Sequence, residues 1–414
     1  MAELITLKNG LKTVLAPCEA ESVAFGLFIA SGSRCESEKT AGISHFIEHM
    51  LFKGTSRRSQ LDITQAIEGR GGNFNAWTSE ESTAYFTHVP FEHLREAVDI
   101  IADMYLHASI PAGEFEKEKH VIIEEIKMYA DEPDAVAMEN LQRSLFPGDQ
   151  LGQPIAGDAA SLLPMKPKDL KSYISSHYLP GNTVAVLVGR FEKDEALKIV
   201  DKALGGRFRT GSPAPKTPAG LVFSAPKAET IVRKDVQQAQ LALGYRTFGV
   251  ADERKYAATV FDAIMGRGMS SRLFQTVREK HGLSYDISSR MQFFSDVGMW
   301  TVTAGIDAGK TGKTLKTVDA ELKRISTKKV PVAELERTKE FLTGNFRMSH
   351  ERVTSKLFYH GSTMLSFGRL VPAEEQVEGI RRVSADDVLA VAREILDPAR
   401  RSVSWVLPNL AGRP

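Results

Sequence analysis

The hydrophobic pattern of the first 70 residues alternates between strand-like and helix-like segments. Residues 11–15 and 23–30 are short, mostly apolar runs of the kind that form strands. Residues 41–53 and 61–69 have the spacing of helices, and Ser59 is placed to cap the second one. This order predicts a fold that mixes strands and helices.

The next segments continue the mixture. Two glycines end the second helix, and residues 73–88 predict two strands joined by a turn at Glu80–Glu81. Helices are expected at about 91–107 and 113–131, and the run VAVLV at 184–188 predicts a buried strand. We therefore expect the α+β class, with mixed or antiparallel sheets packed against helices.

A segment rich in Gly, Pro and Ser divides the chain almost in half. It reads GGRFRTGSPAPKTPAG and has the composition of a linker. We predict an N-terminal domain at 1–205, a linker at 206–220 and a C-terminal domain at 221–414. A chain of 414 residues is also too long for one ordinary core.

The two halves look like copies of one unit. PAGEFEKEKHVIIEE from Pro111 and PVAELERTKEFLTGN from Pro331 share several residues at a constant offset of 220. Glu118 and Glu125 of the first copy are replaced by Thr338 and Asn345 in the second. The helix expected at 252–266 also lacks histidine. The extra His and Glu of the first half are therefore not required by the shared fold.

Composition narrows the classes of function. Apolar residues make up 42% of the chain and charged residues 25%, and the formal net charge is +1. A near-neutral balance argues against nucleic-acid or anionic-membrane partners bound through bulk charge. No apolar run approaches the roughly 20 residues that span a bilayer. We see no secretory signal at the N-terminus, so a cytoplasmic location is the default expectation.

Cys18 and Cys35 are too few for a disulfide framework. They are consistent with one disulfide in an oxidising compartment, but two free thiols in a reducing compartment is the preferred interpretation.

The strongest chemical signal is His-Phe-Ile-Glu-His at 45–49. Residues i and i+4 of a helix lie on one face, so His45 and His49 can reach one metal ion, a common zinc half-site. Glu48 borders that face and can take a proton from a water on the metal. The alternative is a pair of surface histidines beside a solvated glutamate. The helix is apolar nearly all round, which predicts burial, and buried His and Glu need a partner such as a metal.

A catalytic zinc ion usually has three protein ligands and one open position. The candidates for the third ligand are Glu118, Glu124 and Glu125 on the helix expected at 113–131. Glu118 and Glu125 are seven residues apart and share a face, whereas Glu124 points away from it. A solvated helix flank is the alternative for this pair, and the absence of both from the second half counts against it.

These motifs resemble the pitrilysin–insulysin family, the zinc metallopeptidases with H-x-x-E-H in place of H-E-x-x-H. The strings GISHFIEHMLFKGT and EKHVIIEEIKMYADEP carry the resemblance. It implies one zinc ion per chain held by His45, His49 and Glu125, with Glu48 as general base. Glu118 is then the family's second, supporting carboxylate.

The resemblance extends to substrate binding. In the family, a strand at the place of NFNAWT binds an extended peptide through backbone groups near Asn75 and Ala76, although the segment alone is equally consistent with an ordinary paired strand. The segment from Arg278 to Tyr285 resembles the family's R-x6-Y element, whose side chains donate hydrogen bonds to substrate. Surface residues are the default for such a pair without the resemblance.

Chain length suggests the short, two-domain members related to mitochondrial processing peptidase. Such members pair, which implies a clam-shell homodimer in which Arg278 and Tyr285 face the partner's zinc. The glycine-rich loop of the processing peptidase's non-catalytic partner is not recognisable in this sequence. The expected function is zinc-dependent hydrolysis of internal bonds in short or unfolded peptides. The alternative is a non-catalytic peptide-binding or structural subunit of the same fold.

Overall fold

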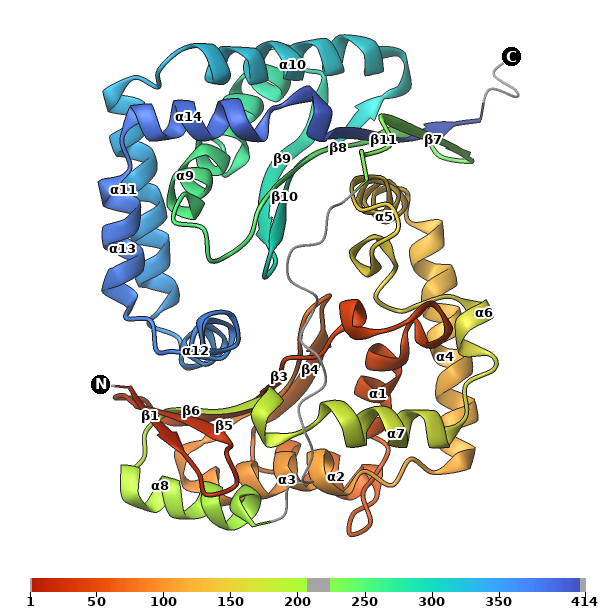
Figure 1. The fold of residues 1–414 in the computed structure, drawn as a ribbon, viewed down its shortest axis with the longest axis vertical. Coiled ribbons are helices and arrows are strands. Elements are labelled where there is room, and N and C mark those ends of the chain that lie inside the picture. The colour runs from red at the N-terminus through yellow and green to blue at the C-terminus, as the bar shows by residue number, and fades with distance from the viewer. Residues whose placement is uncertain (1, 207–223, 410–414) are drawn as a thin grey trace. The chain divides into compact units, whose positions relative to one another are not determined.

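The computed structural model describes residues 2–206 and 224–409 (Figure 1). The described chain forms two compact units, each with its own sheet. The first unit takes residues 2–126, 154–206 and 347–371, and the second takes 127–153, 224–346 and 372–409. The predicted linker at 206–220 lies outside the described residues except for Gly206.

The sheet of the first unit has six strands in the order β1-β2-β6-β3-β5-β4. The strands are β1 (Glu3–Thr6), β2 (Lys12–Pro17), β3 (Ser22–Ile29), β4 (Asn73–Thr78), β5 (Thr83–Pro90) and β6 (Thr183–Gly189). Strands β2 and β6 are parallel and the other neighbours are antiparallel, so the sheet is mixed.

Both faces of this sheet are covered. In β3, Phe25 and Leu27 belong to one hydrophobic cluster, and Ala24 and Phe28 belong to another. Because successive side chains of a strand point to opposite faces, a strand buried on both faces has a continuous apolar run. All seven residues of β6 are buried for the same reason, which confirms the strand predicted from VAVLV.

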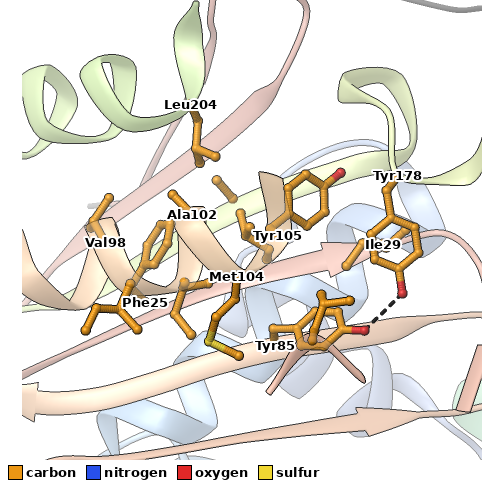
Figure 2. Packing of buried hydrophobic residues seen from close by; sticks show 14 of the residues in the cluster. Phe25, Ile29, Tyr85, Val98, Ala102, Met104, Tyr105, Tyr178 and Leu204 are labelled. Atoms are coloured by element: carbon orange, nitrogen blue, oxygen red, sulfur yellow. Dashed lines mark hydrogen bonds between the residues drawn. The ribbon is translucent and has the colours of Figure 1, made fainter. Parts of the chain in front are cut away.

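All but one of the helices of the first unit share the main core with the sheet. They are α1 (Ile43–Leu51), α2 (Gln60–Glu68), α3 (Leu94–His107), α4 (Ala112–Asp131), α6 (Ala159–Leu162), α7 (Pro167–His177), α8 (Lys193–Val200) and α12 (Val353–Phe367). Figure 2 shows side chains of α3 packed beside Phe25 and Ile29 of β3. In the same core the hydroxyls of Tyr85 and Tyr178 lie 3.0 Å apart, so these buried polar atoms satisfy each other.

Helix α12 comes from the second half of the sequence and packs on the opposite face of the first sheet. Leu357 lies in the cluster that contains Phe28 of β3. A side chain at Gly361 would meet the Phe28 ring at 2.5 Å, so a glycine is needed where helix and strand approach. An element 150 residues or more downstream of β6 thus completes the first core.

The second unit repeats this plan. Its sheet has the order β7-β11-β8-β10-β9, with β11 parallel to β7. The strands are β7 (Glu229–Lys234), β8 (Gln238–Phe248), β9 (Ser284–Phe293), β10 (Val297–Asp307) and β11 (Arg401–Pro408). The helices are α5 (Pro133–Leu145), α9 (Lys255–Gly266), α10 (Thr311–Thr327), α11 (Val332–Ser349), α13 (Ala373–Arg382) and α14 (Ala385–Ile395).

Helix α5 mirrors the exchange made by α12. It comes from the first half of the sequence, and its Leu141 and Leu145 pack against Gly244 of β8. A Cβ atom added at Gly244 would lie 3.0 Å from a methyl carbon of each leucine, so helix and strand are in close contact. The compact units therefore differ from two contiguous halves, because each sheet is covered by one helix from the other half. The domains predicted at 1–205 and 221–414 stay a prediction.

The expected α+β class with mixed sheets matches the described fold, whereas the pairing of two chains stays a prediction. Cys18 and Cys35 are free thiols, and burial raises the pKa of Cys35. None of the helices among the described residues has the length and apolar character needed to cross a bilayer.

Candidate metal centre and peptide-binding strand

Helix α1 carries the HxxEH motif and is held rigidly at its start. Gly42 precedes it with a φ of 88°, and an added Cβ would lie 2.4 Å from the Ala156 carbonyl oxygen, so only glycine fits. The backbone N–H groups of Gly42 and Ser44 donate to the Glu36 carboxylate at 2.7 and 2.8 Å. Glu36 thereby satisfies N–H groups at the start of α1 that have no partner within the helix, and burial raises the pKa of its carboxyl group to about 8.

Three predicted ligands converge above this helix. Nε2 of His45 lies 3.9 Å from Oε2 of Glu125, and Nε2 of His49 lies 3.6 Å from the same oxygen. One ligand atom from each residue lies within 4.8 Å of the others, the sole such His, Cys, Asp and Glu group of three or more among the described residues. Glu125 on α4 therefore lies close enough to both histidines to share a metal ion with them, and its role as third ligand stays a prediction.

This donor set fits a zinc ion. Zinc prefers tetrahedral coordination by imidazole and carboxylate at about 2.0–2.2 Å, which separates ligand atoms by roughly 3.4 Å. The measured separations of 3.6 and 3.9 Å need only small side-chain adjustments. Three protein ligands leave a fourth position open, as in catalytic rather than structural zinc sites.

Local electrostatics also suit metal binding. Burial, and then the neighbouring His49, lower the pKa of His45 to about 4, so its imidazole is neutral near pH 7, the form that ligates metal. Burial raises the pKa of Glu48, while a hydrogen bond from Thr78 acts in the other direction. A carboxylate with a raised pKa accepts a proton more readily, which suits a general base.

Glu118 fixes the orientation of His49. Oε2 of Glu118 lies 3.0 Å from Nδ1 of His49, and because a carboxylate only accepts, Nδ1 carries the proton and Nε2 keeps its lone pair for a metal. Oε1 of Glu118 pairs with Nζ of Lys53 at 2.6 Å. His45 differs, since its buried Nδ1 has no hydrogen-bond partner among the residues that the structure describes.

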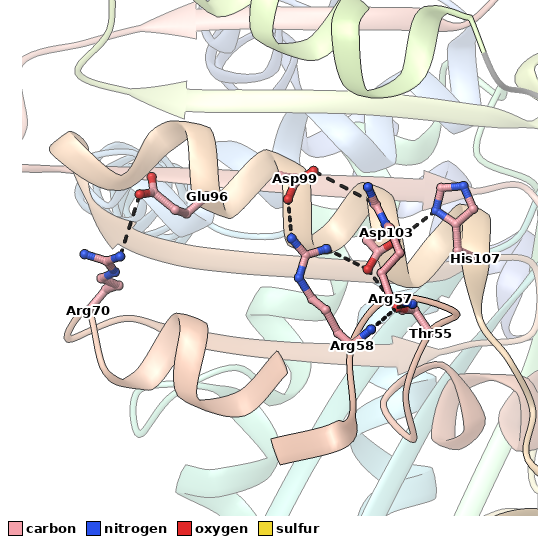
Figure 3. Close-up of polar contacts among 8 residues, drawn as sticks. All are labelled: Thr55, Arg57, Arg58, Arg70, Glu96, Asp99, Asp103 and His107. Carbon is pink, nitrogen blue, oxygen red and sulfur yellow. Dashed lines mark hydrogen bonds and ion pairs between the residues drawn. The ribbon is translucent and has the colours of Figure 1, made fainter. Parts of the chain in front are cut away.

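The loop that carries Lys53 is tied to α3 by a buried acid, Asp103 (Figure 3). Its carboxylate accepts hydrogen bonds from Thr55 Oγ1 at 2.8 Å and from Arg57 and Arg58 at 2.6 Å, and it also lies beside His107. The Asp103 side chain is fully buried, so these partners are needed to offset its desolvation. The network holds the chain that follows α1, and hence Lys53, in one conformation.

Strand β4 is an edge strand, as expected. It pairs only with β5 in the described sheet, with Asn75 opposite Phe86 and Ala76 opposite Tyr85. The N–H of Ala76 donates to the Asn75 side chain at 2.8 Å. An open edge of this kind is able to receive an extended peptide by strand addition. Binding at Asn75 and Ala76 stays a prediction.

Arg278 and Tyr285 lie together in the second unit. The Arg278 guanidinium carbon is 4.7 Å from the centre of the Tyr285 ring, and Tyr285 is 80% exposed at the start of β9. A cation over an aromatic face is attracted to it, so this contact holds the partly exposed Arg278 beside the exposed Tyr285. The structure describes each unit by itself, so the approach of this pair to a metal site stays a prediction.

The sequence patterns did not predict three residues that contact the candidate site or its helix: Glu36, Lys53 and Thr78. Glu36 and Lys53 lie within about two helical turns of the two ends of α1. A charged residue beside a buried helix is a signal from which a contact with that helix can be predicted. Thr78 carries no such signal, since its contact with Glu48 joins residues 30 positions apart. Glu124, the rejected candidate ligand, is exposed, as its helical position predicts.

Two family models match the chain. Residues 13–159 match the model described as insulinase (peptidase family M16), and residues 164–342 match the model described as peptidase M16 inactive domain. The first contains His45, Glu48, His49 and Glu125, and the second covers the repeat that lacks them.

Relatives match over almost the whole chain. A Bacillus subtilis (strain 168) protein named "Uncharacterized zinc protease YmxG" is 34% identical over 95% of this chain and 96% of its own length. A Rickettsia felis protein named "Uncharacterized zinc protease" is 34% identical over 94% of this chain and 93% of its own. The matches to these proteins, both named as zinc proteases, therefore cover both halves of the sequence.

Solved structures share the fold. A protease from Helicobacter pylori superposes with a TM-score of 0.93 at 22% identity, covering 99% of both chains. A chain of Complex III2 from Candida albicans superposes with a TM-score of 0.86 at 20% identity, covering 98% of this chain and 95% of that one. Together with the family models and the zinc-protease relatives, they confirm the predicted resemblance to short pitrilysin-type proteins: this chain belongs to the insulinase family of peptidases, family M16.

Proposed function

We propose that this protein is a zinc-dependent endopeptidase that hydrolyses internal bonds of short or unfolded peptides. The observation that carries the proposal is the close approach of candidate ligand atoms from His45, His49 and Glu125. Glu48 lies on α1, the helix that also carries the two histidines. Relatives named zinc proteases that match 94–95% of this chain support a metallopeptidase.

Each side chain has a distinct task in this proposal. His45, His49 and Glu125 hold one zinc ion, which when bound supplies Lewis-acid activation of water and polarisation of the scissile carbonyl. Glu48 takes the proton of the attacking water at Oε1, since Oε2 accepts from Thr78. Glu48 then passes that proton to the nitrogen of the leaving amine. Glu118 keeps the Nε2 lone pair of His49 directed at the metal.

Strand β4 supports the choice of substrate. A peptide added to an edge strand must be extended, and backbone hydrogen bonds give affinity with little dependence on sequence. A folded protein has few segments free to adopt that conformation. We therefore expect short or unfolded peptides to be cleaved in preference to folded proteins.

Digestion of an internally quenched peptide tests the function. The wild-type protein should cleave it, a chelator should stop cleavage, and added Zn²⁺ should restore it. Glu48→Gln should lower kcat by at least ~100-fold, the contribution typical of a general base, while zinc content measured by mass spectrometry stays at one per chain. Equal turnover by Glu48→Gln would disprove the assigned base.

The alternative is a subunit that binds peptides without cutting them. It predicts peptide binding, measured by fluorescence anisotropy, with no products in the mass spectrum at any zinc concentration. The complete set of three ligands argues against it, since a non-catalytic subunit has no need of an open metal position.

We further propose that Arg278 and Tyr285 complete the site of a second copy in a homodimer. Tyr285 is exposed and Arg278 is partly exposed, and both side chains are hydrogen-bond donors suited to a substrate carbonyl. Mixing two inactive variants, Glu48→Gln and Arg278→Ala, provides the test. If the sites are shared, a mixed dimer has one intact site, and activity returns on mixing. If each chain is self-sufficient, no mixture regains activity.

A further inference from the structure

Thr78 links the predicted peptide-binding strand to the predicted base. It is the last residue of β4, and its Oγ1 lies 2.5 Å from Oε2 of Glu48 on α1. Distances of about 2.5–2.7 Å are typical of a hydroxyl that donates to a charged carboxylate. The contact therefore joins the two elements that the proposed function requires.

The hydrogen bond restricts a flexible side chain through a stiff one. A glutamate side chain has several rotatable bonds and loses much freedom when ordered, whereas the β-branched threonine has restricted χ1 rotamers. Thr78 is half-buried in the strand, and Glu48 is half-buried on the helix. Donation to Oε2 holds the carboxylate in one orientation and leaves Oε1 to meet the reacting water.

The neighbouring threonine shows what a purely structural hydroxyl looks like here. Thr83 pairs with Thr78 in the β4–β5 register, is fully buried, and donates to the Ser31 carbonyl at 2.8 Å. That bond satisfies a backbone acceptor within the first unit. Thr78 instead donates to an ionisable side chain whose neighbour His49 is a predicted ligand.

We propose that Thr78 is a positioning residue that couples peptide addition on β4 to the orientation of Glu48. A peptide paired along the edge of β4 adds hydrogen bonds to that strand and reduces its motion. Because Thr78 ends the strand, this ordering is transmitted to Glu48 through one hydrogen bond. Remote binding energy is then used to orient the base and raises kcat. The inference rests on the proposed peptidase function.

The consequence is a dependence of kcat on peptide length. In the wild-type protein, peptides long enough to pair along β4 should turn over faster than short ones that span only the scissile bond. In Thr78→Val, which keeps the shape and removes the donor, that advantage should disappear. We expect kcat on long peptides to fall by roughly 10–100-fold, part of the contribution of a general base, with KM within about twofold.

The experiment measures kcat and KM for a short and a long quenched peptide with four proteins: wild type, Thr78→Val, Thr78→Ser and Thr64→Val. Thr78→Ser keeps the hydroxyl and should retain most of the rate and the length dependence. Thr64→Val is the matched control, because the Thr64 hydroxyl bonds only to its own helix at Gln60. Zinc affinity, from competition with a chromophoric chelator, should be the same in all four.

Three results would overturn the inference while leaving the peptidase proposal intact. They are a Thr78→Val protein with wild-type kcat, a Thr78→Ser protein as slow as Thr78→Val, and a Thr78→Val protein whose zinc affinity falls in step with its rate. The last would assign the contact to assembly of the metal site. A wild-type protein without zinc-dependent turnover would overturn both proposals.

Discussion

Glu48 in the first unit and Asp262 in the second are acidic residues in comparable places with opposite surroundings. Each lies on a helix that follows a strand of its sheet, and each accepts a hydrogen bond from a hydroxyl on a strand, Thr78 or Ser289. Asp262 also accepts from Trp300 Nε1 at 2.9 Å and pairs with Arg267 at 2.6 Å. Its side chain is fully buried.

The difference separates an acid with structural partners from the proposed general base. Asp262 has a cation and two neutral donors, so its charge is compensated and its oxygens are occupied. Glu48 has one neutral donor, and burial raises its pKa. In the proposed function, the same arrangement of helix and strand carries a reactive acid because the compensating cation is absent and the predicted metal site lies beside it.

The repeated long helices α4 and α11 differ in the same way. Positions that the fold uses are kept apolar and buried, since Phe115 and Ile122 correspond to the buried Leu335 and Leu342. The two carboxylates facing the metal site are replaced, Glu125 by the exposed Asn345 and Glu118 by Thr338, whose hydroxyl bonds to its own helix. Residues 115, 118, 122 and 125 share one side of α4, so the comparison indicates that the predicted metal site replaced two positions beside a core stripe that both copies keep.

The largest effect on zinc affinity is expected when Glu125 is replaced by asparagine, the residue at the corresponding position of α11. Glu125→Asn should lower zinc affinity by on the order of 100–1000-fold, because structural zinc binding of about 10–16 kcal/mol is shared among about four ligands. Competition with a chelator measures this. Glu124→Gln, one residue away and exposed, is the matched control and should keep wild-type affinity.

Removing the compensated acid should affect folding instead of chemistry. Asp262→Ala leaves Trp300 without its acceptor and Arg267 without its partner, while Ser289 keeps only the carbonyl oxygen of residue 262, and we expect a loss of about 3 kcal/mol of folding free energy. For a unit of this size that corresponds to a fall of about 6–12 °C in thermal midpoint, measured by calorimetry. Zinc affinity should not change. A weakened metal site would contradict the separation of the two units' roles.

The smallest effect is expected at Glu118, which contacts the predicted ligand His49 through Nδ1. Glu118→Thr, which again installs the residue of the second unit, should lower zinc affinity by roughly 10–100-fold, the usual effect of losing a group that orients a ligating histidine. Glu116→Gln on the exposed side of α4 is the control. If Glu118→Thr bound zinc as tightly as wild type, the contact with His49 Nδ1 would have no role in metal binding.

The regular elements of the first half were predictable because each follows a local pattern. The strand at 184–188, the cap at Ser59 and the turn between β4 and β5 all appear where spacing and capping rules place them. Helix ends moved by one to three residues, as in α1, which begins at Ile43. The exchange of α5 and α12 between units was not predictable, since a helix face does not encode which sheet covers it.

The sequence alone determined which residues are the candidate metal ligands. Helical periodicity places His45 and His49 on one face, the seven-residue spacing places Glu118 and Glu125 on another, and the repeat shows that the fold does not need them. The tertiary structure decided which atoms meet: Glu125 rather than Glu118 at the metal position, Glu118 between His49 and Lys53, and Thr78 on Glu48. Those contacts join residues 30 to 80 positions apart, where local periodicity carries no information and only the packing of helices on a shared sheet sets the distances.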